Sequence, residues 1–511
     1  RGLGDVYKRQ QFASVANITG GTVKVSGTGV SIGTVSGGGI ILSTGTAQIE
    51  VLNGGDVVNN SILTVRTGTM TGALSGTGVL EKKEAGILTL SGLATHTGQT
   101  NVWNGTLAVG GAATLSNSES LFVDEGALAA FTATTGTITI KAVNGDGTIT
   151  FASNAVIQSG SISEGTVTAL QGRLSANVAG GVVTAAALTA GTVSGGTLSL
   201  LSGDSRVTQL SSNGSINLAS AANLSVNTGT FEGTLTGSGM LTKTGSGSLN
   251  LTAAPQQSTR INVQGGVLNV DELLTGTRSV SVSANARLNT AFSAGTLFLG
   301  QLTGAGETVL SGEGTFTLGT GALIQGSLTL RPNVIFDVSS AGASGVDPAT
   351  SFALLSGSTL NMTATEQKLE VINLVFSSGA KLNANNGTIL YDNLPVFLSN
   401  GTTSAIIDTN NQLLEPYSGL ISGSLTFEEN SKRGAIFGAG VYEFIAGRVK
   451  DLPSDATRLL LNPIPGRTIR ITTGTSVSQE VVAGGTGFVS VGTLVTTPQF
   501  RIGSVIVATV S

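Results

Sequence analysis

Side chains that could carry out chemistry are few in this sequence, and they stand apart from one another. His96 is the only histidine, and it lies in the short segment Thr95–Gly98. A loop histidine can serve as a general base. However, the chain has no cysteine, and no partner for a metal site or a nucleophile triad is spaced nearby. We therefore expect His96 to be a solvent-exposed loop residue, a candidate for surface contact and not for catalysis.

The acidic residues do not form a recognisable site either. Segment Asn144–Ile149 (NGDGTI) resembles part of a calcium loop, but the first ligand position would be Ala142 and the twelfth Ser153. Neither can supply a carboxylate, so we interpret the segment as a turn that leads into a strand. Glu428–Glu429 is too isolated in the sequence to be assigned as a catalytic pair. We predict no catalytic residue, no metal and no cofactor.

Trp103 is the only tryptophan and the most informative single side chain. It precedes Asn104–Gly105, a dipeptide that favours a turn. A large aromatic side chain exposed on a turn can contact a glycan or a protein partner. The alternative is a tryptophan that packs against the neighbouring repeat, and the sequence leaves both interpretations open. Trp103 and His96 are therefore the two candidate surface-contact residues.

Both residues lie in a segment that occurs twice. Leu63–Val109 and Leu224–Val270 align without a gap at an offset of 161 positions, and 19 of the 47 aligned residues are identical. The shared residues are mostly Gly, Leu, Val and Thr, which mark turns and buried strand faces. The reactive side chains differ between the copies: His96 faces Gln257, Trp103 faces Gln264, and Glu81, Lys83 and Glu84 face Thr242, Thr244 and Gly245. A scaffold was duplicated, without the groups that could do chemistry.

Composition and periodicity predict that this scaffold is all-β. The chain has 74 glycines, 40% apolar residues and only 11% charged residues, against roughly 25% charged in typical domains. Short apolar runs alternate with turn residues, which is typical of many short strands. Leu88 is followed by Leu107 and Leu249 by Leu268, so each coil should contain about 19 residues. We expect the matched elements to occupy equivalent places on successive coils, with Leu88, Leu90, Leu107 and Val109 and their counterparts pointing inward.

We therefore predict a right-handed parallel β-helix over residues 11–410, with the internal duplication at 33–109 and 191–270. Residues 1–10 are unlike the rest in composition and are interpreted as an adapter-derived artefact. Residues 411–511 are richer in charge and proline, and we expect an irregular β-rich cap or a separate region. Within it we predict a short helix around Val441–Val449 and a strand over the sequence TIRITTG.

The duplicated segment resembles the autotransporter-associated β-strand repeat. The pattern is carried by Gly76, Gly78, Leu80, Lys82, Leu88, Leu90, Gly92, Thr97, Gly98, Gly105, Leu107 and Val109, and by Gly237, Gly239, Leu241, Lys243, Gly245, Gly247, Leu249, Leu251, Gly265, Gly266, Leu268 and Val270. Glu84 departs from the pattern, which has glycine there. In that family the repeats build parallel β-helical passengers on bacterial surfaces, secreted through a C-terminal membrane barrel. The resemblance implies an extracellular or outer-membrane location and a structural or adhesive role.

Charge and hydropathy limit the partners. The net charge of −4 gives no electrostatic support for nucleic-acid binding, and no apolar run is long enough for a transmembrane helix. Residues 411–511 lack the regular amphipathic strands of a membrane barrel, so we expect any barrel to lie outside this stretch. We expect a non-enzymatic stalk or adhesin whose partners are host or environmental glycans or surface proteins.

Two alternatives to this function stay open. The first is a carbohydrate-active β-helix enzyme, a polysaccharide lyase or hydrolase, because such enzymes assemble acids across neighbouring coils. A cluster of three or more charged side chains on one face would favour it. The second is a phage tail-spike or fibre segment, which obligate trimerisation would favour.

Overall fold

The computed structural model describes residues 14–111, 114–252, 259–271, 279–292, 296–299, 301–318, 324–338, 346–362, 368–377, 379–384, 387–391, 396–399, 402–405, 420–422, 425–429, 441–444, 468–473, 476–482 and 506–508. The predicted artefact at residues 1–10 lies outside them. Every regular element in the described part is a strand, and none is a helix. No helix in the described residues is long and apolar enough to span a membrane. The chain forms two compact units, Arg1–Leu241 and Thr242–Ser511.

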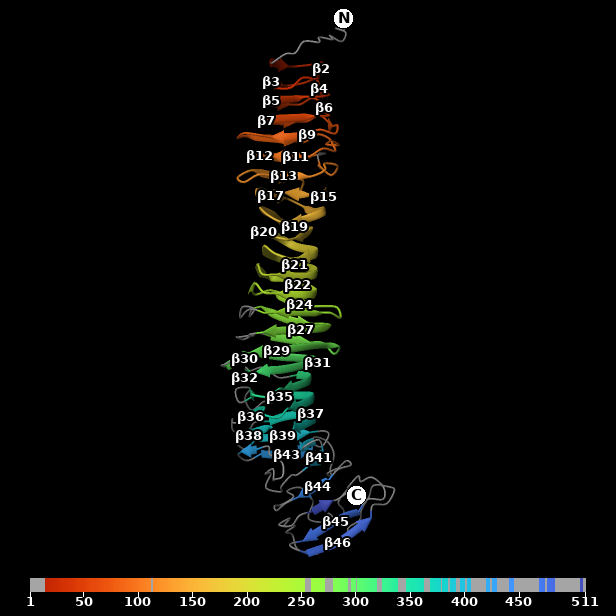
Figure 1. Ribbon diagram of the computed structural model, residues 1–511, viewed down its shortest axis with the longest axis vertical. Coiled ribbons are helices and arrows are strands. Elements are labelled where there is room, and N and C mark those ends of the chain that lie inside the picture. The colour runs from red at the N-terminus through yellow and green to blue at the C-terminus, as the bar shows by residue number, and fades with distance from the viewer. Residues whose placement is uncertain are drawn as a thin grey trace. The chain divides into compact units, whose positions relative to one another are not determined.

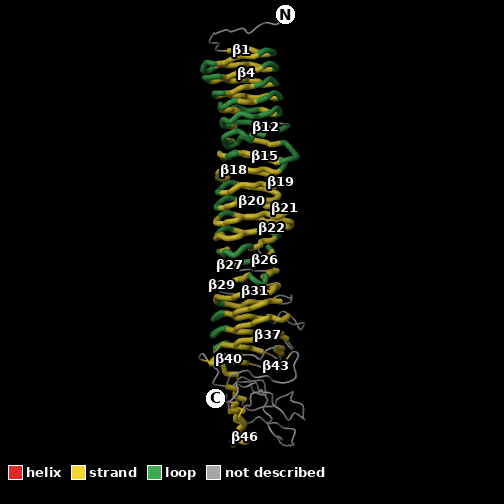
Figure 2. Tube along the Cα trace, turned by 90° about the vertical axis from the view of Figure 1, so that its right-hand side faces the viewer, coloured by secondary structure: helices red, strands yellow, loops and turns green. Residues whose placement is uncertain are grey.

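The first unit is a parallel β-solenoid whose strands lie in stacked layers (Figure 1 and Figure 2). Its strands are β1 Ser14–Ile18, β2 Thr22–Val25, β3 Val30–Val35, β4 Gly39–Leu42, β5 Thr46–Asn53, β6 Val57–Asn59, β7 Ile62–Met70, β8 Leu74–Ser75, β9 Val79–Lys82, β10 Ile87–Leu90, β11 Thr100–Val102, β12 Thr106–Val109, β13 Leu121–Val123, β14 Leu128–Phe131, β15 Thr137–Ile140, β16 Val143–Asn144, β17 Thr148–Phe151, β18 Asn154–Ile162, β19 Thr166–Val178, β20 Val182–Val193, β21 Thr197–Ser212, β22 Ser215–Phe231 and β23 Thr234–Gly237, with β24 Met240–Lys243 at the boundary.

The second unit is also built from strands. They are β25 Ser248–Leu251, β26 Arg260–Val263, β27 Gly266–Asp271, β28 Ser279–Val282, β29 Ala286–Phe292, β30 Thr296–Leu299, β31 Gln301–Gly312, β32 Gly314–Leu318, β33 Ile324–Leu330, β34 Val334–Asp337, β35 Val346–Leu354, β36 Thr359–Met362, β37 Lys368–Ser377, β38 Lys381–Ala384, β39 Gly387–Tyr391, β40 Val396–Ser399, β41 Thr402–Ala405, β42 Leu420–Ser422, β43 Leu425–Glu429, β44 Val441–Phe444, β45 Thr468–Thr473, β46 Ser476–Val482 and β47 Ile506–Ala508. Most of these strands pair in parallel, whereas β40 and β41 pair antiparallel. Strands β30, β32, β34, β36, β38 and β42 form a separate parallel sheet.

The last described strands depart from this pattern. Strand β45 pairs antiparallel with β46 and β47, and β44 pairs antiparallel with β47. The strand predicted over TIRITTG is confirmed by β45. The helix predicted around Val441–Val449 is wrong over its first four residues, which form β44. Three of these four, Val441, Tyr442 and Phe444, are β-branched or aromatic, and such residues favour strands over helices.

The predicted coil spacing and inward face are both confirmed. Leu88 pairs with Leu107 and Leu249 pairs with Leu268, so the leucines that the sequence aligns do lie on successive coils. The predicted inward residues Leu88, Leu90, Leu107, Val109, Leu249, Leu251, Leu268 and Val270 are all at most 2% exposed. The residue between each inward pair, such as Thr89, faces outward. This alternation follows from the two-residue period of a strand.

The prediction that the two copies occupy equivalent places is wrong for the face that they use. Four register steps connect the start of β7 to β16. The part of β22 that aligns with the start of β7 begins at Leu224, and five such steps connect it back to β15. Strand β15 lies in the same coil as β16 and directly precedes it. The starts of the two copies, both in the first unit, therefore lie on neighbouring faces. The reason is that coils differ in length. The coil from Val182 to its partner Thr197 is short, whereas the coil from Leu107 to its partner Ala129 is long, so the offset between the copies is not a whole number of coils.

We expect Leu88→Ala and Leu249→Ala each to lower the free energy of unfolding by about 2–4 kcal/mol, because each leaves a cavity between coils. Thr89→Ala, on the outward side of the same strand, should change it by less than about 0.5 kcal/mol. Urea unfolding of the full chain measures both values. Equal effects at Leu88 and Thr89 would contradict the assignment of inward and outward faces, and a larger loss at Thr89 would show that it is inverted.

Candidate functional site

The side chain of Lys82 is buried at the end of β9, although it carries a charge. It follows Leu80 on the inward side of the strand and is 0% exposed. Its Nζ donates hydrogen bonds to the carbonyl oxygens of Lys83 at 3.1 Å, Glu84 at 2.6 Å and Asn104 at 3.0 Å. Burial lowers the pKa of Lys82. An ammonium group has three donors, so these three acceptors satisfy the charged form.

The second copy repeats this arrangement at Lys243, which is also 0% exposed. Its Nζ donates to the carbonyl oxygens of Thr244 at 2.6 Å, Gly245 at 3.1 Å and Gly265 at 3.0 Å. Burial lowers the pKa of Lys243 as well. In both copies the lysine ties the turn after its own strand to the matching turn of the next coil. We call each group of one ammonium and three carbonyl oxygens a lysine cage.

Close backbone approach at the cage explains a glycine that both copies share. Gly105 has a φ of 75° and Gly266 a φ of 65°. A Cβ on Gly105 would lie 2.8 Å from Lys82 Nζ and 2.5 Å from the Gly86 oxygen, so no larger residue fits. Glu84 also has a positive φ, 66°, where the second copy has Gly245 at 68°. The departure from the repeat pattern at Glu84 therefore keeps a glycine-like backbone at a cost in strain.

The sequence did not predict these cages, since it marks Lys82 and Lys243 only as positions that fit a repeat pattern. One signal could have found them, because lysine is the only charged residue identical between the two copies. A charged residue that is kept among glycine and aliphatic positions, on the inward side of a strand, must be buried and paired.

The side chain of Trp103 lies on the outer surface of the solenoid in the first unit. It contacts both the coil before its own and the coil after it. Its Nε1 donates to Glu81 Oε1 at 3.2 Å on the preceding coil. Its ring lies against Phe122 on the following coil, with centroids 4.9 Å apart and planes tilted by 50°. The side chain is still 38% exposed. Trp103 thus packs on a neighbouring repeat and also presents an aromatic surface, so the two interpretations of the sequence are not exclusive.

Four charged residues lie near Trp103 on the outward side of the same unit. Glu50 pairs with Arg66 at 2.7 Å, and Glu81 pairs with Lys83 at 2.7 Å. Burial raises the pKa of Glu81, but hydrogen bonds from Lys83, Thr64 and Trp103 outweigh it, so that the pKa is lowered overall. A general acid in glycoside cleavage needs a raised pKa. The cluster has as many charges as the enzyme alternative requires, but the partners of Glu81 keep that carboxyl group ionised.

The expectation that His96 is solvent-exposed is wrong. Its side chain is 0% exposed, and Nε2 lies 2.8 Å from Thr100 Oγ1. Thr100 Oγ1 lies 3.1 Å from Ser118 Oγ, which donates to the Gly98 oxygen at 2.7 Å. Because Ser118 has one proton to donate, Thr100 donates to Ser118 and the Nε2–H of His96 donates to Thr100. Nδ1 has no hydrogen-bond partner in the described part of the chain, so the ring is neutral and cannot act as a surface contact.

No group of three or more His, Cys, Asp or Glu that could hold a metal is found among the described residues. Segment Asn144–Ile149 forms the turn between β16 and β17, with Gly145 at a φ of 93°. It therefore leads into a strand, as its sequence predicted.

Comparison with known proteins gives one finding. The family described as passenger-associated-transport-repeat matches residues 80–109 and 241–270. Each match contains the caged lysine, the inward leucine pair and the glycine with positive φ. No curated protein and no solved structure matches the chain. The matched repeats and the parallel solenoid confirm the resemblance to β-helical autotransporter passengers that the sequence indicated.

We expect Lys82→Met to lower the free energy of unfolding by about 2–5 kcal/mol, because three carbonyl oxygens lose the donor that the buried lysine supplies. Lys243→Met should behave in the same way. Lys83→Met is the matched control, since that side chain is 46% exposed and its surface ion pair contributes about 0–1 kcal/mol. Denaturant unfolding of the three variants measures the difference. Equal losses for Lys82→Met and Lys83→Met would contradict a structural role for the cage.

The buried imidazole predicts a loss of stability in acid. Burial lowers the pKa of His96 from 6.5 to about 4. Between these values the unfolded state binds the proton and the folded state does not, so stability falls as the pH drops below 6.5 and the loss is complete below 4. The loss should reach about 2.5 kcal/mol at pH 4.5. His96→Gln, which copies Gln257 of the second repeat, should remove this component. Unfolding free energies at pH 7 and pH 4.5 for both proteins check it, and identical pH dependence would refute it.

Proposed function

We propose that this chain, an autotransporter passenger with β-helix repeats, is a non-enzymatic scaffold at the bacterial surface that serves as a stalk or adhesin. The family implies export to the cell surface. The lysine cage is the observation that carries the proposal. In both copies the one shared charged side chain is used to hold coils together, at Lys82 and at Lys243. The outward groups around each cage differ, so the repeat maintains a support and leaves its surface free to vary.

The surface at Trp103 supports the adhesive form of this proposal. An exposed aromatic ring backed by Phe122 offers a flat apolar surface, and Glu81 holds its indole nitrogen in place. Such a surface can stack on the apolar face of a sugar or on a side chain of a surface protein. Contacts of this size are weak individually, so attachment would depend on many copies acting together on one cell.

A carbohydrate-active enzyme is the second candidate, and one observation favours it. Glu50, Arg66, Glu81 and Lys83 place four charges on one face of the first unit. The arrangement is better suited to holding the face together, because each acid is paired with a cation and Glu81 also accepts from Thr64 and Trp103. A phage fibre segment, the third candidate, would require a trimer, which analytical ultracentrifugation of the full chain distinguishes from a monomer.

We expect the full chain to release no reducing ends and no unsaturated products from a panel of acidic and neutral polysaccharides. The reason is that the pKa of Glu81 is lowered, whereas a general acid needs a raised pKa. Reducing-end assays and absorbance of unsaturated products measure turnover.

Glu81→Gln and Glu50→Gln are the variants that decide the result. If the wild-type chain shows turnover and either variant abolishes it, the proposal of an enzyme replaces that of a scaffold.

For adhesion, Trp103→Gln introduces the residue that the second repeat has at this position. It should reduce attachment of displayed protein to glycan-coated surfaces. Thr89→Ala, on a neighbouring outward position, is the control.

A further inference from the structure

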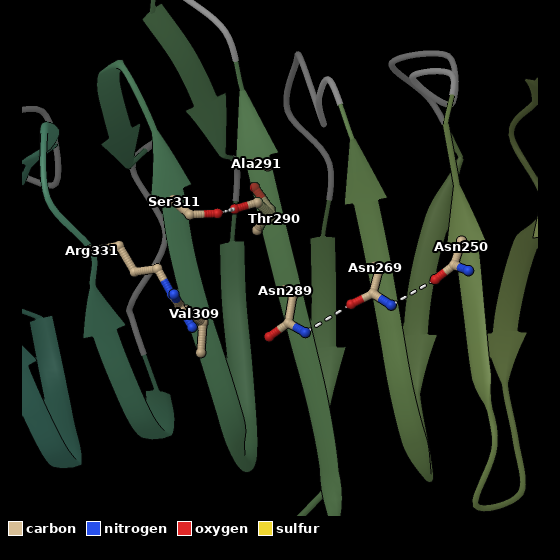
Figure 3. Close-up of a pocket in the computed structure, with 8 residues that line it drawn as sticks. All are labelled: Asn250, Asn269, Asn289, Thr290, Ala291, Val309, Ser311 and Arg331. Atoms are coloured by element: carbon tan, nitrogen blue, oxygen red, sulfur yellow. Dashed lines mark hydrogen bonds between the residues drawn. The ribbon is translucent and has the colours of Figure 1, made fainter.

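A polar groove lies on the outward side of the second unit. It has a volume of about 410 Å³. Its wall is built from β25, β27, β29 and β31, which place Asn250, Asn269, Asn289 and Val309 opposite one another in successive coils. Arg331, the residue after β33, closes one end (Figure 3). Parallel stacking therefore presents one polar side chain per coil, about 4.8 Å apart.

The three asparagines form a ladder that stops at Asn289. Asn269 Nδ2 donates to Asn250 Oδ1 at 2.6 Å, and Asn289 Nδ2 donates to Asn269 Oδ1 at 2.7 Å. The next coil has Val309 at this position and cannot continue the ladder. Asn289 Oδ1 is left without a hydrogen-bond partner among the described residues. An unpaired acceptor of this kind is rare in folded proteins and indicates a missing partner.

Arg331 gives the groove its charge. Figure 3 shows its side chain extending over Val309 towards the asparagine row. The side chain is exposed, and its guanidinium makes no hydrogen bond or ion pair within the part of the chain that the structure describes. Arg287 on β29 and Glu307 on β31 pair with each other at 3.2 Å, so their charges cancel. No acidic residue is among the described residues that line the groove.

The scaffold does not require these asparagines. At the aligned positions of the first copy, Thr89 replaces Asn250 and Ala108 replaces Asn269. Both strands of the first copy keep the same parallel register and the same buried leucines. Packing between coils therefore explains the leucines but not the amides.

We propose that this groove binds an acidic oligosaccharide, with a sugar carboxylate on Arg331 and sugar hydroxyls on the asparagine amides. Guanidinium recognises a carboxylate through paired hydrogen bonds. Primary amides both donate to and accept from hydroxyl groups. An extended saccharide presents its hydroxyls at regular intervals, as the stacked coils present their amides. Because no acid is among the described residues that line the groove, we expect it to hold the saccharide without cleaving it. The inference rests on the adhesive form of the proposed function and names its ligand class.

Calorimetric titration of the full chain with trigalacturonate, against neutral galactotriose, tests the proposal. We expect trigalacturonate to bind and galactotriose to bind about tenfold more weakly or not at all. Arg331→Gln should weaken trigalacturonate binding by about tenfold or more. Asn269→Ala, which carries the residue of the first copy, should weaken both sugars. Thermal unfolding confirms that each variant is folded.

Asn361→Ala is the matched control. Asn361 accepts from Asn383 Nδ2 at 2.7 Å in a second asparagine pair of the same unit, outside the groove. Its replacement should leave binding unchanged. Absence of binding, equal affinity for both sugars, or equal losses at Asn269 and Asn361 would overturn the proposal. Binding of acetate or inorganic phosphate as tight as that of trigalacturonate would also overturn it, as a simple anion site. Cleavage of the bound sugar would instead refute the non-enzymatic function and leave the groove in place.

Discussion

Parallel hydrogen bonding between successive coils is the interaction on which the rest of this structure depends. It fixes the inward leucines in columns, as at Leu88 and Leu107, and brings the turns of neighbouring coils into contact. Turns expose carbonyl oxygens that no strand can pair. The lysine cages supply the missing donors at two such places, and Gly105 leaves the space for the Lys82 ammonium group. At the corner of a coil the lysine ammonium group therefore donates hydrogen bonds to the next coil, as backbone amides do along the faces.

The same stacking separates the support of the molecule from its surface. Inward positions of the two copies are filled alike, whereas outward positions carry Trp103 in one copy and an asparagine row in the other. An outward substitution therefore disturbs neither register nor core. The aromatic surface near Trp103 and the groove beside Arg331 have unrelated chemistry on closely related strands, because the strands impose only spacing and direction on what projects from them.

Much of this fold could be predicted from the sequence, since the two-residue alternation of leucine and its recurrence from one coil to the next are local signals that stacking preserves. The face occupied by each copy could not, because it depends on the summed lengths of coils that are unequal. His96 was placed wrongly for a related reason. Its burial results from Thr100 and Ser118 closing around it, and Ser118 comes from the next coil. The groove was not predicted either, because its residues come from separate coils and are far apart in the sequence.

The offset between the copies shows how such a chain can lengthen. If the whole coil were the smallest workable insert, a duplicated segment would have to return to its original face. Here the start of β7 and the aligned part of β22 lie one strand apart around the circumference, and both are well packed. One strand with its turn is therefore a sufficient unit of growth. Recombination between repeats can therefore insert a segment that is not a whole number of coils. Each such insertion moves the strands that follow it to a different face of the coil.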